Sequence, residues 1–383
     1  MRHLGIIALI NFNDWDNPNY SETGGVNSVI KNIIPFLKAD KIILYGITYQ
    51  KENLFREKKI NEIVSVFPII YKSPKNILPN RILGLLWGWR LKRFLRRHKI
   101  NFIYSHSEEL AFWLPLTGIR YIHHLHTYVN ALKVSNGRLS RIRLLQKLWE
   151  RIRQRVIRNS IKSVAVNREI ALMLESTIGK DRIIRFSNYV DPEKFTYKDP
   201  SDIRIHLNLG DKKVALFIGR ITRVKGMELF VDIVAELNNL DRNNWCGVIV
   251  GNGEYESTLK DYIRNQNLNE SFIFPGSANT SDELSKYYSL ADVFLMTSSS
   301  ESVGLTMLES LSCGTPVVST NVGIALDVLG HYNGYVVSSN DKKEMASCAI
   351  KSLRYKKRQS ILKNAKEYSV EYASNLLNQE FWK

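Results

Sequence analysis

The sequence predicts an α/β protein made of two domains, each built on a parallel sheet. Its length of 383 residues is sufficient for two domains with separate hydrophobic cores. Residues 293–320 contain an apolar strand, a loop with a glycine, a helix-spaced apolar run and a second strand, which together make one βαβ unit. Apolar runs followed by glycine-bearing loops also occur at residues 6–25 and 214–226. This alternation of strands and helices is typical of α/β domains.

The remaining elements follow from short apolar runs and from helical spacing. Strands are expected at residues 6–10, 41–49, 64–70, 101–105, 120–126, 163–166, 214–219, 245–250, 272–276, 293–296, 316–319 and 334–337. Helices are expected at residues 29–37, 81–99, 138–162, 283–291, 305–311 and in the tail from 345 to 383.

The cysteines and the first apolar run bear on the compartment of the protein. Cys246, Cys313 and Cys348 are scattered and fit no metal-binding spacing, which favours a reducing compartment without disulfides. The run at residues 6–10 is short and lacks a small-residue cleavage site, so we expect a buried strand and not a signal peptide. No run approaches the length of a membrane-spanning helix. We therefore expect a cytoplasmic protein.

The net charge of +17 predicts an anionic partner: nucleic acid, an anionic membrane surface or a phosphorylated substrate. Two predicted helices, at residues 81–99 and 138–162, concentrate basic residues beside tryptophans. We expect each to pack an apolar side on the sheet, with its basic residues, Arg153 among them, in solvent. The apolar positions are Leu85, Leu86, Trp89 and Phe94 in the first helix and Ile142, Leu145, Trp149, Ile152 and Val156 in the second.

Such basic helices also suit docking on anionic lipid headgroups, at about 1 kcal/mol per Lys or Arg near the surface. We favour membrane contact over nucleic acid, because the sequence contains no nucleic-acid recognition motif.

Two carboxylates lie eight residues apart in the central βαβ unit. Glu301 is expected on the loop before the helix, and Glu309 about one turn into it. The start of such a helix binds anions through unpaired N–H groups and its dipole, and Gly304 would let a ligand approach the backbone. Carboxylates accept hydrogen bonds from sugar hydroxyls. Taken singly, Glu301 could be only a helix-start charge and Glu309 a solvated helix residue.

A second group of candidates follows the strand at residues 214–218. Gly219 ends the strand, Arg220 and Lys225 follow on the loop, and Gly226 precedes a helix. A guanidinium fork and a movable ammonium can together bind a diphosphate. The alternative is a pair of exposed basic residues.

Three histidines stand at the end of the strand at residues 120–126. His124 and His126 alternate along the strand and should share a face, whereas His123 should point the other way and be structural. His-x-His is a known metal-ligand spacing, but no acidic or thiol third ligand is evident nearby. Gly24 and Gly25, at the start of the first predicted helix, permit close approach of a ligand or form a plain turn.

Residues 301–309, ESVGLTMLE, are followed by SCGTPVV at residues 312–318. This pattern resembles the E-x7-E signature of the retaining, nucleotide-sugar-dependent group 1 glycosyltransferases of family 4, which have the GT-B fold. The resemblance extends over nearly the whole chain. Gly219-Arg220 and Lys225-Gly226 match the diphosphate motif of the family, and Gly251-Asn252-Gly253 resembles its turn near the nucleoside. Val303 departs from the usual Phe, and Thr297 from the common Pro.

The resemblance implies two Rossmann-like domains that face each other across a cleft: residues 1–190 for the acceptor and 191–360 for the nucleotide sugar. Residues 361–383 would form a C-terminal helix that packs back on the first domain. It implies catalytic roles for His126, Glu301, Arg220 and Lys225. It implies donor contacts for Gly25, Gly219, Arg220, Lys225, Gly251, Gly253, Glu301, Ser302, Val303, Gly304, Leu305 and Glu309, and acceptor contacts for Gly24, Gly25 and His124.

The resemblance also implies a retaining hexosyltransferase that needs no metal and no cofactor apart from its nucleotide-diphosphate sugar. The acceptor would be a glycan or a lipid-linked saccharide, as in bacterial surface polysaccharide or lipopolysaccharide synthesis, at the inner face of the cell membrane. Nucleic acid is not expected as a partner. Two alternatives remain: a nucleotide-sugar epimerase on the same scaffold, and a non-catalytic basic module that binds membranes.

Overall fold

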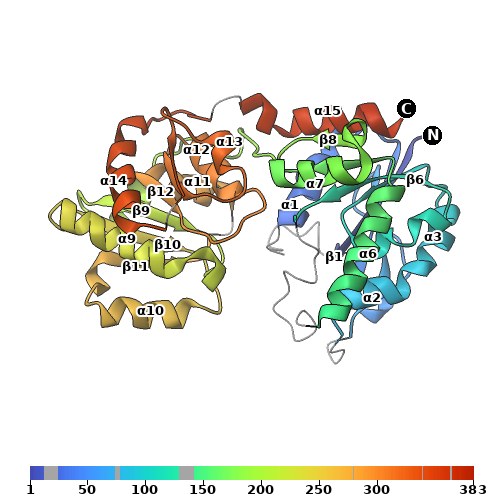
Figure 1. Ribbon diagram of the computed structural model, residues 1–383, viewed down its shortest axis with the longest axis horizontal. Helices are drawn as coiled ribbons and strands as arrows, with labels where there is room; N and C mark the ends of the chain where they lie inside the picture. Colours follow the sequence, from blue (N-terminus) through green and yellow to red (C-terminus); the bar gives the residue numbers. More distant parts are fainter. Residues whose placement is uncertain (13–24, 74–77, 129–141, 279, 339, 363–364) are drawn as a thin grey trace. The chain divides into compact units, whose positions relative to one another are not determined.

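The computed structural model describes residues 1–12, 25–73, 78–128, 142–278, 280–338, 340–362 and 365–383. These residues form two compact units, one of residues 1–187 and 371–383 and the other of residues 188–370 (Figure 1). Each unit contains one largely parallel sheet with helices packed on it. The predicted α/β class and the predicted pair of parallel-sheet domains are therefore confirmed.

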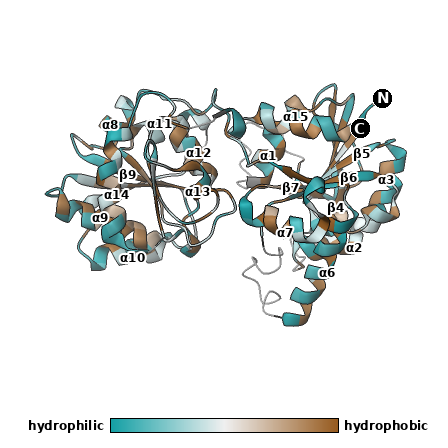
Figure 2. Ribbon diagram, turned by 45° about the horizontal axis from the view of Figure 1, so that its top comes forward, coloured by the Kyte–Doolittle hydropathy of each residue, from teal (hydrophilic) through white to brown (hydrophobic). Residues whose placement is uncertain are grey.

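The first unit contains an eight-stranded sheet with the order β3-β4-β2-β1-β5-β6-β7-β8. All neighbours pair in parallel except β3 and β4. The central strands are continuous apolar runs, brown in Figure 2, because both faces of a parallel sheet are covered. The strands are β1 (His3–Asn11), β2 (Lys41–Thr48), β3 (Lys58–Lys59), β4 (Val64–Tyr71), β5 (Phe102–Ser105), β6 (Arg120–Leu125), β7 (Lys162–Ala165) and β8 (Ile183–Arg185).

The helices of this unit are α1 (Gly25–Ile33), α2 (Asn80–Trp87), α3 (Leu91–Arg97), α4 (Glu108–Ala111), α6 (Arg143–Asn159) and α7 (Arg168–Ile178). The single helix predicted at residues 81–99 is wrong, because a 3-10 turn, η3 (Gly88–Arg90), separates α2 from α3. A Cβ atom on Gly88 would lie 2.4 Å from Cδ1 of Trp113, so the chain bends where this indole packs against it. The expected burial is also wrong for Leu86 and Trp89, which are 54% and 55% exposed.

Helix α6 packs Trp149 and Ile152 inward, as its apolar spacing predicts, but Ile142 before its start is exposed. The expectation that Arg153 faces solvent is wrong, because this side chain is only 2% exposed. Its guanidinium donates hydrogen bonds to the carbonyl oxygens of Thr127 and Tyr128, at 2.6 and 2.5 Å. Arg153 thereby holds the segment that follows β6.

The last helix, α15 (Val370–Phe381), packs on the first unit although its sequence follows the second. The ring of Phe381 lies 5.2 Å from that of Phe102, and the carboxylate of Glu380 is 3.1 Å from the ammonium of Lys162. The side chain of Asn378 accepts a hydrogen bond from the N–H of Lys38. These contacts attach the C-terminal segment to the sheet of the first unit.

The second unit contains a six-stranded parallel sheet with the order β11-β10-β9-β12-β13-β14. The strands are β9 (Lys213–Ile218), β10 (Trp245–Val250), β11 (Phe272–Gly276), β12 (Val293–Met296), β13 (Val317–Thr320) and β14 (Gly334–Val337). The direction in which strands are added reverses between β9 and β12. Open α/β sheets bind ligands at the carboxyl ends of the strands at such a switch point.

Helices cover both faces of this sheet (Figure 1). Helix α9 packs against α10 and α14, whereas α11 packs against α8 and α12. Their bounds, with those of α13, are α8 (Ser201–His206), α9 (Met227–Leu240), α10 (Glu256–Asn265), α11 (Ser281–Leu290), α12 (Leu305–Ser312), α13 (Ala325–Val328) and α14 (Lys342–Ser352). Within the described parts of the chain, no helix has both the length and the hydropathy required to cross a bilayer.

Candidate functional site

The loops that follow β9 and β10 are hydrogen-bonded to each other at the switch point of the second sheet. The N–H of Gly219 donates to the carbonyl of Val250 at 3.0 Å, and the N–H of Ile221 donates to that of Asn252 at 2.9 Å. A Cβ atom on Gly251 would lie 2.0 Å from the carbonyl oxygen of Gly219. The predicted donor-binding residues Gly219 and Gly251 therefore lie side by side. Their backbones approach so closely that no side chain fits at position 251.

Lys225 and Glu301 form an ion pair at this edge of the sheet. Lys225 ends the 3-10 turn η7 (Arg223–Lys225), and its Nζ lies 2.5 Å from Oε1 of Glu301. The same carboxylate oxygen accepts a hydrogen bond from Oγ of Ser298 at 2.8 Å. Both charged side chains are partly open to solvent. Because an ammonium has three donors, Lys225 can hold Glu301 and an oxygen of a bound anion at the same time.

Backbone contacts fix the loop after β12 against the loop after β9. The N–H of Ser299 donates to the carbonyl of Val224 at 2.9 Å, and Oγ1 of Thr297 donates to that of Lys225, also at 2.9 Å. Gly226 has a φ of 64°, and a Cβ atom there would lie only 2.1 Å from the carbonyl oxygen of Thr297. The position of the Lys225–Glu301 pair thus depends on close packing of two backbones.

We expect Gly226→Ala to lower the free energy of unfolding by more than Gly210→Ala does. Gly210 has a similar φ of 52°, but a Cβ atom there would contact nothing within 4 Å. Left-handed backbone alone costs a non-glycine residue about 1–3 kcal/mol, so the excess loss at Gly226 measures the clash with Thr297. Urea denaturation of both variants and the wild type checks this, and equal losses would show that the second loop can move aside.

Helix α12 begins beside the ion pair. Gly304 caps its N-terminus with a φ of 84°, and Val303 is buried, with its carbonyl accepting from the N–H of Ile324 at 3.2 Å. Ser302 precedes them, and Leu305 is the first helical residue. The first N–H groups of a helix have no partner within it and attract anions. The expected anion site at residues 303–305 therefore lies at the N-terminus of a helix of eight residues.

Glu309 lies in the second turn of α12 and is half-buried. Oε2 of its carboxylate accepts a hydrogen bond from the Tyr288 hydroxyl at 2.6 Å. Burial raises the pKa of Glu309 to about 7, although this hydrogen bond acts in the opposite direction. The alternative of a solvated helix residue is therefore wrong.

Of the predicted residues of this unit, the structure brings Lys225, Glu301 and the start of α12 together, and it places Arg220 as an exposed residue on the same loop as Lys225. A Cβ atom on Gly253 would lie 2.1 Å from the carbonyl oxygen of Ile221, so this glycine belongs to the contact between the two loops. Sequence reasoning missed Ser298 and Tyr288, which hold the two carboxylates. Ser298 adjoins the motif, whereas nothing in the sequence links Tyr288 to Glu309.

In the first unit, His124 and His126 lie on one side of β6 with a third histidine, His106, from the end of β5. The rings of His124 and His126 are stacked, with centroids 4.3 Å apart. Nδ1 of His106 lies 2.9 Å from Nε2 of His126, and the Tyr104 hydroxyl lies 2.5 Å from Nδ1 of His124. His123 faces the other way, toward Ser105.

Burial favours the neutral form of three of these imidazoles, those of His106, His123 and His126. It lowers the pKa of His126 to about 4 and that of His123 to about 3, and it places the pKa of His106 well below its usual range. Sequence reasoning missed His106. The available signal was that His106 and His126 follow neighbouring parallel strands, whose carboxyl ends meet at one edge of the sheet. Of the two predicted glycines, Gly25 begins α1 and Gly24 lies outside the described residues.

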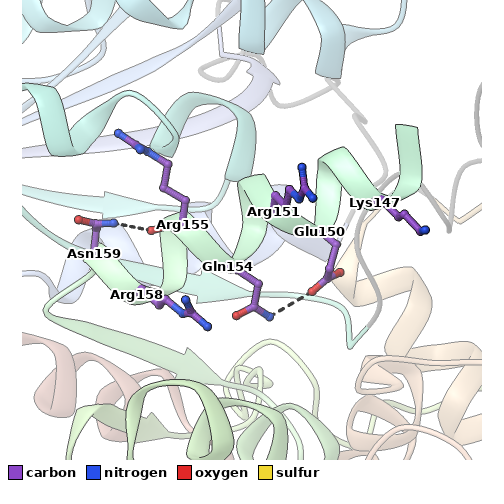
Figure 3. A pocket seen from close by; sticks show the side chains of 7 residues that line it. All are labelled: Lys147, Glu150, Arg151, Gln154, Arg155, Arg158 and Asn159. Carbon is purple, nitrogen blue, oxygen red and sulfur yellow. Dashed lines mark hydrogen bonds between the residues drawn. The ribbon is translucent and has the colours of Figure 1, made fainter. Parts of the chain in front are cut away.

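A hollow of about 510 Å³ lies along one face of α6, and none of the residues that line it is a predicted site residue (Figure 3). Four basic residues at helical spacing supply most of its polar groups, and Glu150 accepts a hydrogen bond from Gln154 within it. The lining residues are Lys147, Glu150, Arg151, Gln154, Arg155, Arg158 and Asn159. This face of the helix therefore presents a concentrated positive charge.

Two protein-family models match the chain, one in each half. Residues 23–194 match glycosyltransferase family 4, and residues 199–368 match the glycosyl transferases group 1. Among curated relatives, a D-inositol 3-phosphate glycosyltransferase of Corynebacterium jeikeium is 26% identical over 86% of this chain and 84% of its own length. An uncharacterized glycosyltransferase of Methanocaldococcus jannaschii is 30% identical, and the match covers 40% of each chain.

Solved structures with the same fold have low sequence identity to this chain. Sucrose-phosphate synthase of Thermosynechococcus elongatus superposes with a TM-score of 0.75 at 15% identity, over 99% of this chain and 98% of that one. Anabaena HepE in complex with UDP and glucose superposes with a TM-score of 0.70 at 16% identity, over 99% of both chains.

Proposed function

Because the chain belongs to the group 1 glycosyltransferases of family 4 and has the GT-B fold, we propose that it transfers a hexose from a nucleoside-diphosphate sugar with retention of configuration. The observation that carries this proposal is the Lys225–Glu301 ion pair beside the N-terminus of α12. A cation and unpaired helix N–H groups suit a diphosphate, and a carboxylate next to them suits the hydroxyls of the attached sugar.

In this proposal the second unit binds the donor. Lys225 and Arg220 contact the diphosphate and stabilise the negative charge that develops as its bond to the sugar breaks. The N–H groups of residues 303–305 contribute to the same site, Glu301 binds the transferred sugar and Glu309 binds the ribose.

In the first unit, His126 contacts the transferred sugar. His124, Gly24 and Gly25 contact the acceptor. The acceptor hydroxyl oxygen forms the new bond to the anomeric carbon, on the face from which the diphosphate departs. Its proton passes to the departing diphosphate oxygen, so the reaction requires neither a separate carboxylate base nor a metal. Neutral His126 can accept or donate one hydrogen bond to a sugar hydroxyl without adding charge.

Thermal unfolding in the presence of nucleoside diphosphates and nucleotide sugars tests the donor site. At 100 times its dissociation constant a ligand stabilises the folded state by about 2.7 kcal/mol, so one nucleotide series should raise the melting temperature. Release of free nucleoside diphosphate should then require an acceptor. Conversion of the nucleotide sugar to an epimer without such release would establish the epimerase instead, and no response to any nucleotide would exclude both enzymes.

We also propose that the first unit docks on an anionic membrane, where a lipid-linked saccharide of surface polysaccharide or lipopolysaccharide synthesis would be its acceptor. Leu86, Trp87 and Trp89 are exposed on α2 and η3, and the guanidinium of Arg90 lies 4.1 Å from the Trp87 ring. Leu144 on α6 is 76% exposed near the basic hollow. Exposed apolar side chains among basic residues are typical of segments that bind at the membrane interface.

We expect the double variant Leu86→Ser, Trp89→Ser to bind anionic vesicles at least tenfold more weakly, because burial of each such side chain contributes about 1.5–3 kcal/mol. Sedimentation with phosphatidylglycerol vesicles measures this, and Leu240→Ser, which changes an apolar residue of similar exposure in the second unit, is the control. Equal binding by the wild type and the double variant would contradict docking through this surface.

A further inference from the structure

One buried cation of the first unit reaches the segment of the chain that leaves the end of β6. Arg153 lies within α6, and its side chain is only 2% exposed. Its guanidinium donates hydrogen bonds to the carbonyl oxygens of Thr127 and Tyr128, which directly follow His126. We propose that Arg153 is a positioning residue for sugar transfer, because it fixes the segment on which His126 stands; this rests on the proposed function only for the role of His126.

The planar shape of the guanidinium suits this task. Strand β6 ends at Leu125, and beyond it two different nitrogens of Arg153 supply donors to consecutive carbonyl oxygens. A guanidinium presents its donors in a rigid fork, so two bonds made at once restrict both the position and the orientation of the segment. The neighbouring ring of His126 has its Nε2 2.9 Å from Nδ1 of His106, a contact that a small shift of the segment would break.

Glu108 connects Arg153 to the segment after β5. Oε1 of Glu108 lies 3.4 Å from Nε of Arg153, and this residue follows His106 by two positions. Neither that Nε nor Oε2 of Glu108 has a hydrogen-bond partner among the described residues, so the pair is an electrostatic contact. The directed hydrogen bonds of the guanidinium go to the segment after β6, while its charge faces the segment after β5.

Core packing does not account for an arginine at this position. Arg153 stands four residues after Trp149, on the side of α6 that packs inward. Burial of a charge is costly, and apolar residues in place of a buried ion pair often leave a fold equally stable or more stable. The two carbonyl oxygens that Arg153 holds therefore explain its presence better than the core around it does.

Hydrogen exchange of the full chain, followed by mass spectrometry, tests the positioning without any substrate. The double variant Arg153→Gln, Glu108→Gln removes both charges together, so neither is left buried without its partner. We expect faster deuterium uptake in peptides that span residues 120–128 and unchanged uptake in those that span residues 41–48, which form β2. Unchanged uptake at 120–128, or faster uptake over the whole first unit, would overturn the proposal.

Two further variants make the result independent of whether the double variant folds. Arg153→Lys keeps the positive charge beside Glu108 but not the planar fork, and it should show the same local change to a smaller degree. Arg185→Gln removes an arginine of the same unit whose ion pair with Glu175 lies at the surface, and it should leave the segment after β6 unchanged.

Steady-state kinetics connects the positioning to the reaction. We expect Arg153→Lys to lower kcat by about 10²-fold, the effect of a displacement of about 1 Å in a reacting geometry. Its affinity for nucleoside diphosphate should be unchanged, because the donor binds to the second unit, and Arg185→Gln should keep the wild-type kcat. A local change in exchange with an unchanged kcat would overturn the role of Arg153 in transfer. No response of the wild type to any nucleotide would instead overturn the proposed function, and the exchange experiment would still decide whether Arg153 holds the segment.

Discussion

Lys225→Ala is expected to lower kcat for sugar transfer by about 10²–10³-fold, the effect of removing one group that stabilises charge in a transition state. Lys225 is held 2.5 Å from Glu301 on a loop that three hydrogen bonds attach to the segment after β12. It is therefore already in place for the departing diphosphate. Loss of the ammonium also leaves Glu301 with Ser298 as its hydrogen-bond partner and free to repel the phosphates.

Steady-state kinetics with the donor identified by thermal unfolding measures this effect. Lys213→Ala is a matched control, because Lys213 forms a 2.6 Å ion pair with Asp241 at the opposite end of β9. The control should retain the wild-type kcat, and Lys225→Arg should retain more activity than Lys225→Ala because it keeps the charge. If kcat and nucleotide affinity were unchanged in Lys225→Ala, Lys225 would not contact the donor.

The arrangement of the second unit could be predicted because its signals are local. Residues 293–320 carry strand, glycine, helix and strand in one continuous stretch, and the structure has β12, α12 and β13 there. Gly219 and Gly226 likewise follow a strand and precede a helix. In such a unit the chain order alone places the loops at the carboxyl edge of the sheet, so neighbours in sequence become neighbours in the site.

What the sequence could not predict depends on contacts between distant residues. Arg153 stands four residues after Trp149 and therefore lies on the buried side of α6, but its charge favoured a position in solvent. The carbonyls of Thr127 and Tyr128, which accept its hydrogen bonds, make the burial of this side chain possible. His106 joins the other histidines only through pairing of β5 with β6. Gly88 interrupts a helix because the Trp113 ring occupies the space of a side chain. Composition and spacing contain none of these three-dimensional neighbours.

Glu309→Gln is expected to make the protein more stable at pH 8 while leaving its stability near pH 4.5 almost unchanged. Burial raises the pKa of Glu309 from the ordinary 4.5 to about 7. Between these values the folded state holds a proton that the unfolded state has released, so the carboxyl makes the protein less stable as the pH rises. Above pH 7 the loss approaches about 3 kcal/mol. Glutamine does not titrate, and its carbonyl can still accept the Tyr288 hydrogen bond.

Urea denaturation at several pH values between 4.5 and 8 measures this difference, with Glu270→Gln as the control because Glu270 is exposed on a 3-10 turn of the same unit. If the free energy of unfolding depended on pH in the same way for Glu309→Gln and the wild type, burial would not raise the pKa of Glu309. The same variant should bind nucleoside diphosphate more weakly if Glu309 contacts the ribose. A higher free energy of unfolding together with weaker nucleoside diphosphate binding would mean that the carboxyl of Glu309 serves ligand binding, because an amide at this position stabilises the fold more.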